Sequence, residues 1–230
     1  MRFVKQNTKL KITIPSLSGL LMTRFAAELL LSSSHPTMFE VLQAYLERNT
    51  KLTEEDITLI RSVFLPRFFK KGEFFLREGE VAKYGAFVTK GFLRSYVIDN
   101  KGKEHIIQFA PENWWIGGKG PDSPETSSSV FIDAIEDSEV LLIDVKGHRT
   151  MMERVAGYAA GFRAGIERRS AAKDKRIVHS LTASAEERYS DFLATYPNIV
   201  QRVPQHMLAS YLGITPETLS RIRAKALQKK

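Results

Sequence analysis

The feature that most constrains the fold is a change of pattern near Met151. Residues 63–143 consist of short aromatic or β-branched runs separated by turn sequences such as Lys71-Gly72-Glu73 and Lys90-Gly91. After Met151, apolar or small residues instead recur mostly three, four or seven positions apart. Turn-punctuated runs are typical of a compact sandwich or roll, and the longer period is that of a helix. We therefore predict an α+β chain in which a β-roll of the jelly-roll kind precedes several helices.

The same patterns divide the chain into four parts. Residues 1–37 mix basic, apolar and Ser-rich stretches, and form either a flexible, disordered arm or a stretch ahead of a true start at Met38. Residues 38–150 are predicted to be the roll domain. Residues 151–182 are predicted to be one long helix. Residues 183–230 are predicted to be a small helical domain, which a Ser-Ala-Glu-Glu capping box opens.

The predicted roll domain has further local signals. Met38–Arg48 is an amphipathic helical stretch, and Thr53 precedes an acidic first turn, so two short helices should come before the roll. Phe87–Ile98 and His105–Phe109 flank an Asn-Lys-Gly turn, and we expect them to form one hairpin. Gly117–Ser129 is rich in Gly, Pro and Ser, which predicts a loop long enough to be a binding element.

Composition excludes several classes of protein. No cysteine occurs among the 230 residues, which rules out disulfides, thiolate metal sites and cysteine nucleophiles and fits a reducing cytoplasm. No run approaches the roughly 18 to 20 apolar residues of a membrane span. Ile12–Leu31 follows four basic residues and loosely resembles a secretory signal, but Arg24 and Glu28 interrupt it. We therefore expect a cytoplasmic protein with no membrane partner.

The net charge of +8 is concentrated at the two ends of the chain. Residues 201–230 hold six Lys or Arg against Glu217 alone, and residues 1–37 hold five against one Glu. Contacts of Lys and Arg to phosphates release counterions and supply most non-specific affinity for nucleic acid. The C-terminal end is therefore either a polyanion-binding segment or simply a solvated basic tail.

The long predicted helix carries an apolar stripe. A helix of roughly 30 residues spans about 45 Å, which is too long to lie wholly against a roll of this size. Part of the stripe should therefore meet another subunit, and parallel pairing in a homodimer is the simplest arrangement. The residues assigned to this dimer seam are Val155, Ala159, Phe162, Ile166 and Ile177.

Gln205–Arg223 has the spacing of a helix-turn-helix. A small residue, Ala209, is followed four positions later by Gly213, where the turn needs a positive φ that glycine adopts without steric cost. Thr215 can cap the second helix and Pro216 can take its first position. The apolar residues that should close the small core are Leu208, Leu212, Ile214, Leu219 and Ile222. This is the spacing of a DNA-binding helix-turn-helix, although a structural helical hairpin can mimic it.

The solvent face of the second helix supplies candidate contacts to double-stranded DNA. Glu217, Ser220 and Arg221 are assigned to base reading, because arginine forks onto guanine and glutamate accepts from cytosine. Glu217 and Arg221 could instead be a surface ion pair, since they are four residues apart. The residues assigned to the DNA backbone are Thr215, Thr218, Arg223, Lys225, Lys229 and Lys230.

Residues 38–230 resemble the Crp/Fnr regulators. The resemblance rests on Lys71-Gly72-Glu73, on Leu76–Glu80, on the turn at Gly91, on Asp133–Ser138, and above all on Leu208–Arg221. It implies a cyclic-nucleotide-binding-like roll, a dimerisation helix and a C-terminal helix-turn-helix that binds inverted-repeat DNA. It also implies a small-molecule effector and RNA polymerase as partners.

The recognition helix itself is similar to the Fnr-like kind. Its order Glu-x-x-Ser-Arg ends at Arg221. Crp-like members carry an arginine where this chain has Pro216, so that base contact is not carried over.

This chain departs from the family's pattern at the cyclic-nucleotide pocket. The family's Phe-Gly-Glu and later Arg are replaced by Ile116-Gly117-Gly118 and by serines at 127–129. Burying a phosphate without a cation is costly, so cAMP and cGMP are not expected to bind tightly, although Lys119 could substitute. The candidate effector-pocket residues are Trp115, Gly117, Gly118, Lys119, Ser128, Ser129 and Phe131. The sequence ends soon after the recognition helix, so no β-hairpin wing is evident.

Two other classes of function compete with DNA binding. A cupin-like enzyme on the roll would need clustered His and carboxylate ligands, whereas only His105 and His148 lie in or beside the roll, where surface or hairpin roles are expected. We therefore assign no catalytic residue, no metal site and no cofactor. A module whose helix-turn-helix makes protein contacts only is the second alternative.

Overall fold

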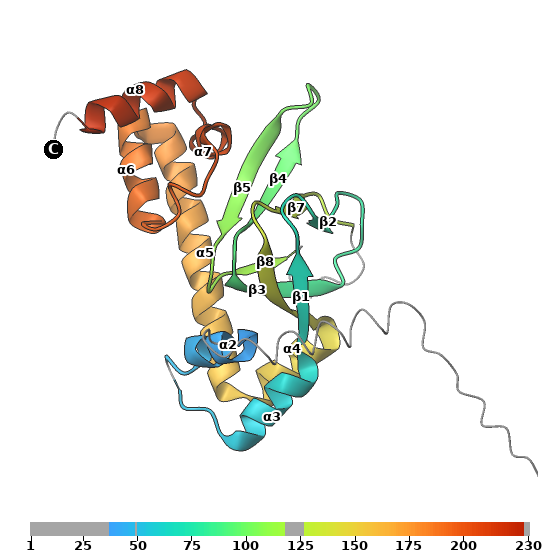
Figure 1. Ribbon diagram of the computed structural model, residues 1–230. Helices are drawn as coiled ribbons and strands as arrows, with labels where there is room; N and C mark the ends of the chain where they lie inside the picture. Colours follow the sequence, from blue (N-terminus) through green and yellow to red (C-terminus); the bar gives the residue numbers. More distant parts are fainter. Residues whose placement is uncertain (1–36, 49, 118–126, 228–230) are drawn as a thin grey trace, which may run out of the picture. The chain divides into compact units, whose positions relative to one another are not determined.

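The computed structural model describes residues 37–48, 50–117 and 127–227 (Figure 1). The chain divides into two units, residues 1–37 and 38–230, and the fold below is that of the second unit. The predictions made for residues 1–36, Gly118, Lys119, Lys229 and Lys230 lie outside the described residues. None of the helices in the described ranges is both long and apolar enough to cross a membrane.

Two four-stranded antiparallel sheets form the roll, which makes the chain α+β as predicted. One sheet has the strand order β1-β8-β3-β6 and the other has the order β2-β7-β4-β5. The strands are β1 (Leu65–Phe69), β2 (Phe74–Leu76), β3 (Tyr84–Lys90), β4 (Leu93–Ile98), β5 (Glu104–Ala110), β6 (Trp115–Gly117), β7 (Phe131–Ala134) and β8 (Ser138–Asp144).

The prediction that Phe87–Ile98 forms one arm of a hairpin is wrong in part. The stretch is two strands, β3 and β4, which belong to different sheets. The chain changes sheet at Gly91, which has φ +92°, and a Cβ there would lie 2.4 Å from Ser138 Oγ. Only β4 pairs with β5 across the Asn-Lys-Gly turn, and this hairpin is confirmed.

A buried arginine links three strands of the second sheet. Arg94 on β4 donates to Asp133 on β7 through Nε (2.7 Å) and Nη2 (3.0 Å). Its Nη1 donates to Glu104 on β5. Burial opposes the charged form, yet the two carboxylates outweigh it and raise the pKa of the Arg94 guanidinium. This cation is therefore fully matched inside the roll.

In the described part of the chain, four helices flank the roll before the C-terminal domain. They are α2 (Met38–Leu46), α3 (Glu54–Val63), α4 (Val145–Arg154) and α5 (Ala156–Thr182). As predicted, Thr53 caps α3, in a capping box completed by Asp56. Figure 1 shows α5 running from the level of α2 to the C-terminal helices.

The long helix starts later than predicted, and part of its assigned dimer seam is used within the chain. Val155 has extended dihedrals (φ −119°, ψ 96°), so α5 begins at Ala156 and not at Met151. Val155 is completely buried in a core shared with α2, α3 and α4, and Phe162 packs against Trp115, His148 and Tyr158. Val155 is therefore not available to a partner subunit, whereas Phe162 keeps part of its surface exposed. The seam prediction is wrong for Val155.

Candidate nucleic-acid interface

The C-terminal domain consists of α6 (Ala185–Thr195), α7 (Gln205–Leu212) and α8 (Pro216–Leu227). Ser184 caps α6 in the predicted capping box, with Glu187 as its partner. Between α7 and α8, Gly213 adopts the left-handed conformation (φ +67°, ψ 36°), and its N–H closes α7 on Ala209 and Ser210. Thr215 Oγ1 accepts from the N–H of Thr218 at 3.2 Å, and α8 begins at Pro216. The predicted turn and cap are thus confirmed.

A small apolar core fixes the angle between α7 and α8. Leu208 and Leu219 are completely buried, and Ala209 lies beside them with 1% exposure. Leu212 and Ile222 are buried as well, and Ile214 packs against the same cluster. Burial of this apolar side removes one face of α8 from solvent, so the opposite face is the one available to a partner.

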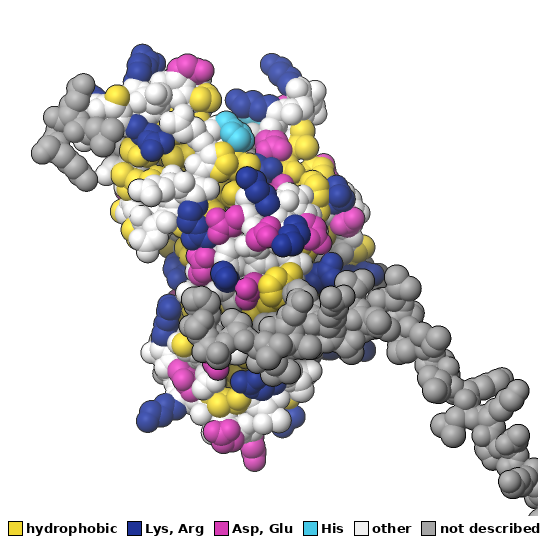
Figure 2. Space-filling model, in the orientation of Figure 1, with side chains coloured by type: hydrophobic (Ala, Val, Ile, Leu, Met, Phe, Trp, Pro, Cys, Tyr) yellow, Lys and Arg dark blue, Asp and Glu magenta, His cyan; other side chains and the backbone are white. Residues whose placement is uncertain are grey.

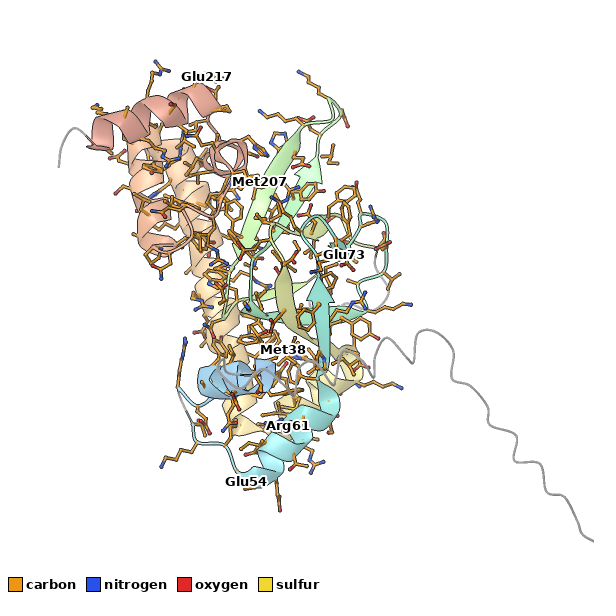
Figure 3. All side chains as sticks on the ribbon, viewed as in Figure 1. Met38, Glu54, Arg61, Glu73, Met207 and Glu217 are labelled. Atoms are coloured by element: carbon orange, nitrogen blue, oxygen red, sulfur yellow. The ribbon has the colours of Figure 1, made fainter. Side chains whose placement is uncertain are left out.

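The available face of α8 carries the three predicted base-reading residues. Glu217, Ser220 and Arg221 are all exposed, and Figure 3 shows Glu217 at the outer edge of the domain. Arg221 Nη2 donates to Thr218 Oγ1 at 3.3 Å, and no ion pair joins Arg221 to a carboxylate among the described residues. Hydrogen bonds from its own backbone N–H and from Thr215 lower the pKa of Glu217, with a smaller contribution from the charge of Arg221. The lowered pKa favours the ionised form of Glu217, and both side chains are exposed.

The residues predicted to contact the DNA backbone differ in their contacts within the protein. Thr215 and Thr218 are engaged in the cap of α8, and Arg223 is half-buried. Lys225 Nζ lies 3.7 Å from Glu186 Oε1 on α6, with both side chains mostly exposed. Such an exposed pair contributes at most about 1 kcal/mol, so a phosphate could displace it.

Arg202 belongs to the basic C-terminal segment but does not serve the exposed face. Its guanidinium donates to Glu112 at 2.9 Å and to Glu136 at 2.5 Å, and also to the carbonyl oxygen of Gly91 at 3.1 Å. The carboxylates raise the pKa of Arg202, and the largest contribution comes from the hydrogen bond that Arg202 donates to Glu112. The C-terminal segment therefore has fewer unpaired cations than its composition suggests. Arg202 instead links the C-terminal domain to the roll.

Aromatic side chains complete this attachment. Phe109 on β5 lies 6.0 Å from Phe192 on α6 and 5.1 Å from Tyr211 on α7, measured between ring centroids. Ser210 Oγ on α7 accepts from the N–H of Ile106 and donates to the carbonyl of Glu104, so α7 follows the edge strand β5. The sequence reasoning missed this contact, and its only signal was the density of aromatic residues in both regions.

The structure does not gather the predicted effector-pocket residues into one site. Trp115 and Gly117 lie on β6 and line a pocket between β3, β6 and α5, whereas Phe131 lies on β7 in the other sheet. Phe131 stacks on Tyr96 at 5.3 Å. Ser128 is buried and bonds to Val130 within its own turn, and Ser129 is exposed. The grouping is therefore wrong for Phe131, which sits apart from Trp115.

The described residues hold no cluster of three His, Cys, Asp or Glu side chains that could bind a metal ion. His105 is held by Asp99 in the β4–β5 turn at 2.8 Å, the hairpin role predicted for it. His148 is not a surface residue, because it is buried beside α5 and its Nδ1 lies 2.6 Å from Tyr158 Oη. Each histidine thus has a structural role.

Comparisons with known proteins agree with this architecture. Residues 66–155 match the family model described as the cyclic nucleotide-binding domain. No curated protein sequence is significantly similar to the chain. Among solved structures, FixK2 from Bradyrhizobium japonicum has a TM-score of 0.62 at 21% identity, over 73% of this chain and 86% of that one.

Two further solved structures share the fold. CLP from Xanthomonas campestris, described as a c-di-GMP responsive global regulator, has a TM-score of 0.61 at 13% identity, over 77% of this chain and 93% of that one. A Eubacterium rectale protein assigned to the Crp/Fnr family of transcriptional regulators has a TM-score of 0.58 at 18% identity, over 80% and 88%. At these identities the likeness establishes the fold.

Proposed function

Because the chain contains a cyclic nucleotide-binding domain and has the fold of Crp/Fnr-family transcription regulators, we propose that it is a sequence-specific DNA-binding regulator that acts as a homodimer. It is proposed to bind an inverted-repeat site, with RNA polymerase as a further partner and with no catalytic activity of its own.

The observation that carries the proposal is the exposed face of α8. Its first two turns present Glu217, Ser220 and Arg221 together, while Leu219 and Ile222 hold the other side of the helix in the core. In a recognition helix, the N-terminal residues are the ones that reach base edges in the major groove. An arginine without a carboxylate partner can fork onto guanine at no cost in broken ion pairs.

The charge around this face fits a polyanion. Figure 2 shows Lys and Arg side chains at the outer side of the α8 region. Among the described residues, Arg221, Arg223 and Lys225 project from α8, against Glu217. Lys and Arg contacts to phosphates would position the helix, and the base contacts would supply specificity.

A second copy of the chain is proposed to cover the free side of α5. Ile177, Val178 and Leu181 are 61%, 54% and 82% exposed, and Ile166 is 42% exposed. Large apolar side chains exposed at helical spacing indicate a contact surface. Ala159, Phe162, Ile166 and Ile177 thus remain in the proposed seam, without Val155.

The proposed regulator is not expected to bind cAMP or cGMP tightly in its roll. Gly118 stands where the family has its ribose-binding glutamate, and serines at 127–129 stand near its phosphate-binding arginine. Calorimetry should give no dissociation constant below about 10 μM, which corresponds to roughly −7 kcal/mol. A tighter constant for either nucleotide would contradict this part of the proposal.

Selection from a random DNA pool tests the function directly. The full chain should enrich an inverted repeat whose half-site centres lie one helical turn apart, about 34 Å, with a G·C pair in each half. Light scattering should show a dimer at micromolar concentration. Recovery of unenriched DNA would overturn sequence-specific binding, and a stable monomer would overturn the dimer. Failure to bind any DNA would favour a helix-turn-helix used for protein contacts.

A further inference from the structure

A pocket lies on the side of α5 that faces the C-terminal domain. It is lined by residues of α5, α6 and α7 and reaches Gly213 at the helix-turn-helix turn: Ala172, Lys175, Arg176, His179, Ser180, Arg188, Asp191, Phe192, Thr195, Tyr211, Leu212 and Gly213. None of these residues belongs to the roll, so the pocket is separate from the cyclic-nucleotide position. Its walls combine apolar and aromatic side chains with an excess of cations.

The single carboxylate of the pocket is already engaged. Asp191 on α6 accepts from Lys175 Nζ at 2.8 Å and pairs with His179 Nδ1, both on α5. The close contacts of this carboxylate are thus with Lys175 and His179, and neither arginine of the pocket forms an ion pair with it.

Those two arginines lack a counter-ion. Arg176 Nη1 donates to the carbonyl oxygen of Ile107 at 3.0 Å, and its guanidinium lies over the Tyr211 ring at 4.1 Å. Burial lowers the pKa of Arg176. Arg188 Nη1 donates weakly to the carbonyl of Ala183 at 3.3 Å, and its buried Nε has no hydrogen-bond partner within the described part of the chain. Neither has a carboxylate partner among the described residues.

This arrangement differs from that of the buried Arg94 and the partly exposed Arg202. Each of those two arginines holds two carboxylates, which offset the loss of hydration of the cation. In the pocket, Arg176 and Arg188 have only carbonyl and aromatic contacts. An anion bound there would supply the missing charge and a partner for a buried N–H.

The walls define the rest of the ligand. Phe192, Tyr211 and Leu212 are buried and apolar or aromatic, so they offer little to a small hydrated ion. We propose that this pocket is an effector site for a small organic anion, an apolar or aromatic body that carries one carboxylate. The carboxylate would lie beside Arg188 and Arg176, and the body would pack on the aromatic walls.

The proposed dimer contact leaves the pocket open. Ala172, Arg176 and His179 recur at helical spacing on one face of α5, whereas Ile177 and Leu181 lie on the opposite face. Because Leu212 and Gly213 line the pocket, an occupant would bias the placement of α8. This effector role rests on the proposed DNA-binding function, but binding at the site does not.

Benzoate is the probe. Benzyl alcohol is the control for its charge, and inorganic phosphate is the control for its aromatic ring. Backbone amide NMR of the full chain should show saturable benzoate shifts at Leu212 and Gly213, and much smaller shifts with the two controls. The affinity for benzoate should fall about 10-fold or more in Arg188→Gln, since a charge-assisted contact is lost. It should be largely kept in Arg188→Lys and in Arg163→Gln, which alters an exposed arginine of α5.

Several results would overturn the site. They are the absence of shifts up to about 10 mM benzoate (about −2.7 kcal/mol), equal binding of benzyl alcohol, or unchanged affinity in a folded Arg188→Gln protein. The effector role has its own readout. Benzoate should change the affinity for selected DNA in the wild type and not in Arg188→Gln. If benzoate binds without changing DNA affinity, the effector role is wrong while the site stands, and loss of DNA binding altogether would instead refute the proposed function.

Discussion

Arg94 in the roll and Arg221 in the helix-turn-helix have opposite surroundings. In the roll, Arg94 is 6% exposed and holds both Asp133 and Glu104. On α8, Arg221 is exposed and has only a hydroxyl partner, Thr218. A buried guanidinium must be matched by carboxylates, whereas an exposed one keeps its charge in water at no comparable cost. The difference indicates that the first arginine holds the fold together and the second is available for a partner.

The largest effect is expected from removal of the matched cation of the roll. Arg94→Met leaves Asp133 buried without its partner, which should lower the free energy of unfolding by about 3–5 kcal/mol. Urea denaturation would measure it. The matched control is Arg67→Met, because the Arg67–Glu73 pair is exposed (54% and 40%) and should contribute at most about 1 kcal/mol. Similar small losses of stability in both variants would show that the buried arginine contributes no more to the fold than the exposed one.

A smaller loss of stability is expected at Arg202, which pairs with two carboxylates but is partly exposed. Arg202→Gln should destabilise the attachment of the C-terminal domain by about 1–3 kcal/mol, discounted for solvent at a site with 28% side-chain exposure. Burial opposes the charged form of Glu112, but the contacts with Arg202 outweigh it and lower the pKa of Glu112. The contribution of Glu112 is therefore present above its ordinary pKa and is lost as the pH falls through the lowered one.

The pH dependence of stability separates the contribution of charge at Arg202 from that of packing. The difference in unfolding free energy between wild type and Arg202→Gln should shrink as the pH falls below the ordinary Glu pKa of 4.5. Lys90→Gln alters the Lys90–Glu139 pair, in which Lys90 is exposed and Glu139 is half-buried, and it should change stability little at any pH. A pH-independent loss in Arg202→Gln would show that packing, and not charge, makes the attachment.

The smallest effect concerns the exposed β4–β5 turn. The hydrogen bond from His105 and the backbone N–H groups of Lys103 and Lys101 lower the pKa of Asp99 to about 2. The stability that ionised Asp99 gives the turn should be present above pH 3.8 and be lost as the pH falls toward 2. In His105→Gln, carboxyl NMR should show the pKa of Asp99 nearer its ordinary value. An unchanged pKa would assign the shift to the backbone alone.

Features built from near neighbours could be predicted from the sequence. The caps at Thr53, Ser184 and Thr215 and the turn at Gly213 depend on residues within about four positions of one another, so local chemistry fixes them. The exposed face of α8 follows from the same local reasoning, because Leu219 and Ile222 determine which side is buried.

Features built from distant partners could not be predicted in the same way. Arg94 and Asp133 are 39 residues apart, and Arg202 and Glu112 are 90 apart, so no local pattern joins them. Val155 was misassigned for the same reason. Its spacing fits the stripe of α5, but its backbone ends α4, and its side chain is buried with α2 and α3. An apolar stripe does not say which neighbour covers it.

Sequence reading by α8 is tested by a comparison of Arg221→Ala with Lys225→Ala on selected and random DNA. Arg221→Ala should lose about 1–3 kcal/mol on the selected site and little on random DNA, because its guanidinium is assigned to a base. Lys225→Ala should weaken both alike, because its ammonium group is assigned to a phosphate. Fluorescence anisotropy at one fixed salt concentration measures both ratios. Equal losses on selected and random DNA in Arg221→Ala would contradict base reading by Arg221, since the exposed arginine of α8 would then contact only the DNA backbone.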